Sequence, residues 1–133
     1  MLESIEHRGR DDQGVWTSTD IDDEGRRVFL GHRRLAIIDT SSAGHEPMLT
    51  SDGRYVLTFN GEIYNYKELR QELQALGRRF HTDSDAEVLL AAFAEWDSEC
   101  VGRLNGMFAF AVWDNKERRL TLVRDHVGIK PLY

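Results

Sequence analysis

The chain has 133 residues, of which 41% are hydrophobic and 30% charged, with a formal net charge of −6 and one cysteine. This length and balance predict one soluble globular domain over residues 1–133 that folds without a disulfide or metal. The acidic balance argues against electrostatic binding of nucleic acid or anionic lipid. No apolar run approaches the ~20 residues of a membrane span. A single cysteine favours a reducing, cytoplasmic location.

The first third of the chain predicts the end of a helix followed by short strands. Residues 2–7 are typical of the last turns of an amphipathic helix, and Gly9 stands where a C-terminal cap would lie. Apolar and β-branched runs then predict strands over residues 15–17, 28–32 and 34–38.

The middle of the chain carries two turn signals and one helical stripe. Asp52-Gly53 predicts a hairpin turn before a strand over residues 55–59, and Asn60-Gly61 predicts a second pair with positive φ that ends this strand. Apolar residues then recur at helical spacing and Gly77 stops the helix; the stripe consists of Tyr66, Leu69, Leu73 and Leu76.

A capping box opens the second helix. Ser84 is expected to cap it, and Glu87 to reach back to the cap. A short helix is expected around residues 101–104. Residues 107–113 are apolar at every position, which predicts a strand buried on both faces, with residues 120–123 as its hairpin partner. Because the strands come in hairpins and the two clear helices are consecutive, the fold class is α+β, with helices on largely antiparallel sheet.

No metal or nucleotide site is predicted. The five histidines are scattered without the i, i+4 spacing of a zinc site, and no glycine-rich phosphate motif follows a strand. Cys100 lies in a polar stretch with no histidine near it in the sequence, so we expect a structural role for this thiol.

Three features could bind a substrate, although each also has an ordinary structural explanation that spacing alone favours. The Asn60 amide and the Gly61 N–H could converge on an oxyanion, or simply form a turn. Arg34 could hold a carboxylate, or reach solvent from a strand end. Asp85 could receive an ammonium group, or complement the helix dipole.

Six blocks occur together in order and carry a resemblance to a known family. The chain resembles the glutaminase domain of glutamine-hydrolysing asparagine synthetases, which are class II glutamine amidotransferases, and the resemblance covers essentially all 133 residues. Phe-Asn-Gly-Glu-Ile-Tyr-Asn and Gly-Ile-Lys-Pro-Leu-Tyr point to the asparagine synthetase branch in particular. The blocks are residues 7–14, 31–39, 59–65, 84–87, 104–110 and 124–133.

The resemblance implies a fold and a chemistry. The fold would be the N-terminal-nucleophile αββα sandwich of two antiparallel sheets between helical layers. In the family, an N-terminal cysteine thiolate attacks the side-chain amide of glutamine, and ammonia passes to a second domain that amidates aspartate. The glutaminase domain needs no cofactor, whereas ATP and Mg belong to the synthetase domain, which this sequence does not include.

The resemblance also implies roles for eight residues. Arg34 matches the arginine that holds the glutamine α-carboxylate, and Asn60 and Gly61 match the oxyanion hole. Glu62 and Asp85 match the acids that receive the α-amino group. The strand whose backbone lines the same pocket corresponds to Leu35, Ile37 and Ile38.

The departures from the family concern the nucleophile. The family's Met-Cys-Gly-Ile start has no counterpart here, since Leu2 follows Met1 and the first residues match a later helix. Arg10 and Glu46 stand where proline and glutamine are usual. We therefore expect a fragment, without its first strand, that keeps the L-glutamine pocket but is inactive alone. The alternatives are a non-catalytic amino-acid-binding module and an interaction module that forms homo-oligomers through an exposed sheet edge.

Overall fold

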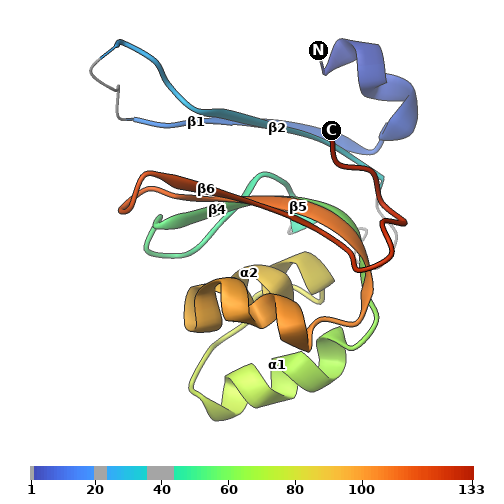
Figure 1. Ribbon diagram of the computed structural model, residues 1–133, viewed down its shortest axis with the longest axis vertical. Helices are drawn as coiled ribbons and strands as arrows, with labels where there is room; N and C mark the ends of the chain where they lie inside the picture. Colours follow the sequence, from blue (N-terminus) through green and yellow to red (C-terminus); the bar gives the residue numbers. More distant parts are fainter. Residues whose placement is uncertain (1, 20–23, 36–43) are drawn as a thin grey trace.

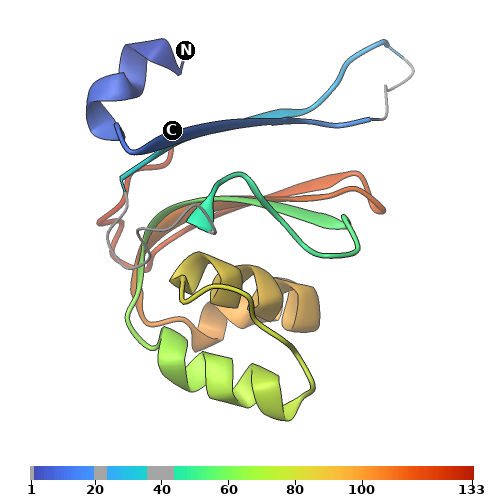
Figure 2. The same cartoon turned by 180° about the vertical axis from the view of Figure 1, so that it is seen from behind.

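The computed structural model describes residues 2–19, 24–35 and 44–133, and these form an α+β fold (Figure 1). A two-stranded hairpin lies over one face of a four-stranded sheet, and helices cover the other face (Figures 1 and 2). The predicted fold class is therefore confirmed. The elements are η1 (Glu3–Arg8), β1 (Asp12–Thr17), β2 (Phe29–Arg34), β3 (Met48–Leu49), β4 (Tyr55–Ile63), α1 (Tyr66–Ala75), α2 (Asp85–Trp96), η3 (Asp97–Arg103), β5 (Gly106–Asp114) and β6 (Arg119–Arg124).

The larger sheet has the order β3-β4-β5-β6 with every neighbouring pair antiparallel. The predicted hairpin of residues 107–113 and 120–123 is confirmed as β5 and β6. Burial on both faces of β5 holds only in part. Phe108, Phe110 and Val112 are buried in the core beneath the helices, whereas Met107 and Trp113, which alternate with them, are only half-buried.

The two helices follow their apolar stripes. Leu69 and Leu73 of α1 are buried, and Gly77 has the positive φ of 91° expected just beyond a helix end. Leu76, assigned to the stripe, lies beyond the last helical residue and is 54% exposed. Within the described part of the chain, no helix has the length and apolar character that crossing a bilayer requires.

The start of α2 uses only half of the predicted capping box. The Ser84 hydroxyl accepts a hydrogen bond from the backbone N–H of Ala86 at 3.1 Å, as a cap should. The Glu87 carboxylate does not reach back to Ser84, because it accepts from the backbone N–H groups of His81 and Thr82 instead. Glu87 therefore holds the preceding loop onto α2.

The prediction that Asn60-Gly61 ends a strand is wrong. β4 continues through both residues to Ile63, and neither residue has a positive φ. Gly61 pairs with Phe108 of β5, and a Cβ at Gly61 would lie 2.2 Å from the carbonyl oxygen of Met107. Glycine is required here for the close approach of two strands and not for a turn.

The N-terminal elements differ in detail from the sequence prediction. The expected helix end is the 3-10 helix η1, and Gly9 caps it in an extended conformation, with φ −160°. The expected strand over residues 28–32 is β2, which runs on to Arg34 without a break at Arg33. The rest of the strand expected over residues 34–38 lies outside the described residues after Leu35.

Candidate functional site

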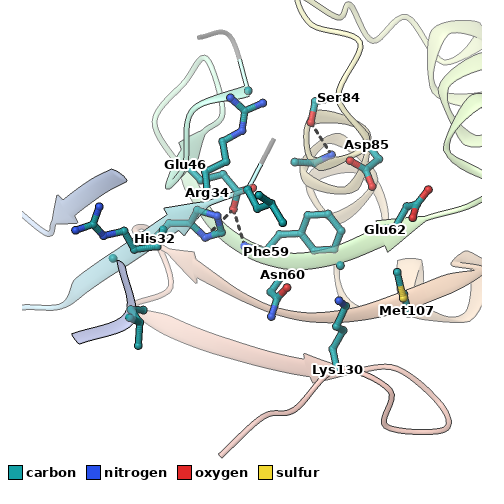
Figure 3. Close-up of a pocket in the computed structure, with 17 residues that line it drawn as sticks. His32, Arg34, Glu46, Phe59, Asn60, Glu62, Ser84, Asp85, Met107 and Lys130 are labelled. Atoms are coloured by element: carbon teal, nitrogen blue, oxygen red, sulfur yellow. Dashed lines mark hydrogen bonds and ion pairs between the residues drawn. The ribbon is translucent and has the colours of Figure 1, made fainter. Parts of the chain in front are cut away.

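A cavity of about 370 Å³ opens where the end of β2, the middle of β4, the start of α2 and the chain near residue 130 meet (Figure 3). Sequence positions far apart in the chain thus line one space. Of the eight predicted site residues, six line this cavity: Arg34, Leu35, Asn60, Gly61, Glu62 and Asp85. The other two, Ile37 and Ile38, lie outside the described residues.

Arg34 is the last residue of β2 and is half-buried at the cavity wall. Its guanidinium group packs against Gly44, since a Cβ at Gly44 would lie 2.1 Å from Nη2 and 2.7 Å from Cζ. The loop therefore makes room for the guanidinium by having glycine at this position. A planar guanidinium on a cavity wall is suited to bidentate binding of a carboxylate.

Acidic side chains form the opposite side of the cavity. Asp85 and Glu62 lie across Phe59 from Arg34 (Figure 3). Asp85 is buried, and its Oδ2 accepts a hydrogen bond from the backbone N–H of Ile63 at 2.9 Å, which ties the start of α2 to the end of β4. Burial raises the pKa of Asp85 above its usual range, against the effect of the backbone N–H donors. Two acids on this wall would attract a ligand's ammonium group.

Asn60 and Gly61 are consecutive residues of β4 beside the cavity. The Asn60 side chain is exposed and leaves β4 on the side of Lys130 (Figure 3). The two donors that an oxyanion would need, the Asn60 amide and the Gly61 N–H, thus belong to one rigid strand held by β5.

Glu46 and His32 are cavity residues to which sequence reasoning assigned no role. Glu46 is only 6% exposed, and its Oε2 accepts a hydrogen bond from the backbone N–H of Phe59 at 2.6 Å. The Nδ1 of His32 lies 3.6 Å from the same oxygen. The one sequence signal for Glu46 is that it departs from the glutamine usual at its position, and His32 stood inside a matching block.

Lys130 is a third cavity residue without a predicted role. Asp125 positions it, because its buried carboxylate accepts from the backbone N–H groups of Lys130 at 2.9 Å, Ile129 at 2.8 Å and Phe108 at 3.2 Å. Burial acts to raise the pKa of Asp125, but these donors outweigh it and lower the pKa to about 2. The block at residues 124–133 was the signal that could have pointed to this lysine.

Cys100 is remote from the cavity. It is fully buried in η3, belongs to the hydrophobic core, and does not line the cavity. Burial, with a smaller effect of Asp97, raises the pKa of its thiol to about 12, the opposite of what a reactive thiolate needs. Among the residues described, no three His, Cys, Asp or Glu side chains gather as a metal ion would require.

Comparisons with known proteins show the family to which this sequence is similar. The glutamine amidotransferase domain family matches residues 1–133. Asparagine synthetase [glutamine-hydrolyzing] 1 of Bacillus subtilis is 47% identical over 100% of this chain and 20% of its own length. Asparagine synthetase [glutamine-hydrolyzing] 2 of Oryza sativa is 40% identical over 97% of this chain and 20% of its own length. This chain spans about a fifth of these relatives.

The fold is also similar to that of a solved structure. Glutamine phosphoribosylpyrophosphate amidotransferase from B. subtilis matches with a TM-score of 0.77 and 22% sequence identity. The match covers 98% of this chain and 34% of that enzyme.

Proposed function

The chain belongs to the family of glutamine amidotransferase domains, and we propose that its cavity binds L-glutamine. The observation that carries this proposal is the gathering of six predicted site residues, far apart in sequence, around one space of about 370 Å³. That size is at the lower end of the range for small-molecule sites, and it combines a guanidinium on one side with acids on the other.

Each end of glutamine has a complementary group in the proposed complex. Arg34 holds the α-carboxylate, and Asp85 with Glu62 receives the α-ammonium group. The side-chain amide then lies along β4, where the Asn60 amide and the Gly61 N–H stabilise the oxyanion that forms when the amide carbon is attacked.

Hydrolysis needs a nucleophile that we do not assign to this chain. Its one cysteine, Cys100, is buried in the core with its thiol pKa raised to about 12 by that burial. We therefore propose that these 133 residues bind glutamine without hydrolysing it. In a longer protein, the domain would release ammonia from glutamine for a synthetase domain that uses ATP and Mg to amidate aspartate. Cytoplasmic location and homo-oligomer formation stay predictions.

We propose further that the two sheets correspond to the inner layers of an αββα sandwich. Helices α1 and α2 would form one outer layer, and η1, beyond the hairpin, would begin the other (Figure 2). The matching fold of the phosphoribosylpyrophosphate amidotransferase supports this arrangement.

Isothermal titration calorimetry with glutamine tests the proposal. We expect binding that Arg34→Ala weakens on the order of 100-fold, because a charged bidentate contact is lost. Arg79→Ala, which removes an exposed arginine outside the cavity, is the matched control and should bind normally. Absence of binding at millimolar glutamine would refute the proposed ligand. Glutamate release that survives Cys100→Ala would show that the chain is active by itself.

A further inference from the structure

The cavity contains a buried acid that the proposed glutamine contacts do not use. Glu46 lines the cavity although it is only 6% exposed. One carboxyl oxygen accepts from the backbone N–H of Phe59 at 2.6 Å and lies 3.6 Å from Nδ1 of His32. That nitrogen lies 3.1 Å from the hydroxyl oxygen of Thr58. Glu46 thus lies between β2 and β4, almost fully shielded from solvent.

Charged and titratable groups face Glu46 from each side. His32 and Arg34 lie on β2, Asp85 lies at the start of α2, and Lys130 lines the cavity from the chain beyond β6. β4 contributes Glu62 and the backbone donor Phe59 N–H. Burial, followed by the effect of Asp85, raises the pKa of Glu46 to about 8 against the lowering effects of Phe59 N–H and Arg34. Burial, and then Arg34, lowers the pKa of His32 to about 4. The contact at neutral pH therefore joins a neutral acid and a neutral imidazole, and it is not an ion pair.

We propose that the protonation state of Glu46 controls how tightly the cavity binds the α-carboxylate of its ligand. This inference rests on the proposed function, because it concerns the same cavity and ligand. A neutral Glu46 adds no negative charge beside Arg34. An ionised Glu46 places a second anion on that wall, where it repels the ligand carboxylate at low effective dielectric constant. Glu46 thereby favours binding of the ligand's α-carboxylate at neutral pH and opposes it in base.

The size of the effect follows from the fraction of molecules that can bind. When only the protonated form binds, the apparent Kd equals the intrinsic Kd divided by the protonated fraction. With the pKa of Glu46 at about 8, the Kd would be nearly intrinsic at pH 7 and about tenfold weaker at pH 9. Because the ligand stabilises the protonated acid, binding near pH 8 should also take up a proton from the buffer.

Calorimetry with glutamine between pH 7 and 9 tests the inference in the wild-type chain and in Glu46→Gln. The glutamine side chain that replaces Glu46 in the variant keeps the size of the wild-type side chain and a carbonyl that accepts from Phe59 N–H, but it does not titrate. The free ligand has an α-amino group that does titrate in this range. This affects both proteins equally, so the ratio of the two Kd values isolates Glu46. We expect the ratio to change about tenfold over this range. Proton uptake near pH 8 should be larger in the wild type than in the variant, which keeps only the uptake due to the ligand's amino group.

A second measurement follows Glu46 directly. In ¹³C NMR of the wild-type chain, its carboxyl signal should titrate near pH 8 without ligand and at higher pH with saturating glutamine. Parallel pH profiles for the two proteins, or titration of the carboxyl near its ordinary value, would overturn the inference and leave glutamine binding intact. Failure of both proteins to bind glutamine at any pH would refute the proposed function, and the inference with it.

Discussion

Replacing Glu46 with glutamine should change how the stability of the fold depends on pH, independently of any ligand. Glu46 has an ordinary pKa of 4.5, and burial raises the pKa to about 8 in the folded protein. A raised pKa means that the folded state binds this proton more tightly than the unfolded state does. The stability that this tighter proton binding adds to the folded state is complete below pH 4.5 and is lost as the pH rises toward 8.

The magnitude can be worked from this difference. Each pH unit between the two pKa values removes about 1.4 kcal/mol, so the total loss is at most about 5 kcal/mol. His32 acts in the opposite direction, because its pKa falls from 6.5 to about 4 through burial and the nearby Arg34. Its contribution is present above pH 6.5 and is lost as the pH falls toward 4. The two effects cancel between about pH 4.5 and 6.5, and Glu46 alone acts between about 6.5 and 8.

Urea denaturation followed by tryptophan fluorescence gives the free energy of unfolding at each pH. The wild-type value should fall between pH 6.5 and 8 by about 2 kcal/mol, whereas the value for Glu46→Gln should stay level. Glu68→Gln removes an exposed acid of α1 and serves as the matched control, with a profile like that of the wild type. If the Glu46→Gln and wild-type curves run parallel in this window, the reasoning about the buried acid is wrong.

Two further predictions concern the strands and the loop around the cavity. Gly61→Ala should cost about 2–3 kcal/mol of unfolding free energy in urea denaturation, because its Cβ would lie 2.2 Å from the carbonyl oxygen of Met107. Gly102→Ala, whose Cβ would meet nothing within 4 Å, is its control, and equal effects of the two variants would contradict the steric argument. Burial raises the pKa of Asp125, but backbone N–H groups, including that of Lys130, outweigh it and lower the pKa to about 2. The wild type should therefore lose stability as the pH falls below 3.8 toward 2, and Asp125→Asn should reduce this loss. Denaturation curves at pH 7 and pH 2 measure this, and an equal loss in both proteins would exclude Asp125 as the group responsible.

Local patterns predicted the elements whose causes are local. The stripe through Leu69 and Leu73, with Gly77 as the stop signal, predicted α1 from its own sequence, and Gly77 has the positive φ of such a stop. The apolar run of β5 and its partner β6 are joined by a short turn, so their pairing also involved neighbours in the chain. Such features need little knowledge of what packs against them.

Features that depend on distant contacts could not be read in this way. Asn60-Gly61 has the composition of a turn, yet β5 pairs with both residues and keeps them in β4. Glu87 stands at capping-box spacing, but its carboxylate accepts from the N–H groups of His81 and Thr82 in the preceding loop. In both cases a tertiary contact overrides a local preference, which is why a motif alone gave the wrong geometry.

In the site, too, the sequence predicts which residues are present better than it predicts their protonation. Ordered motifs were enough to nominate Arg34, Asn60 and Asp85, because each belongs to a recognisable block. Glu46 follows a polar loop and, by composition alone, would be an ordinary surface acid. Its chemistry arises only when β2 and β4 close over it, since burial and not residue type raises its pKa to about 8. A sequence can therefore name the charged groups of such a cavity, but which of them carry charge at neutral pH depends on packing.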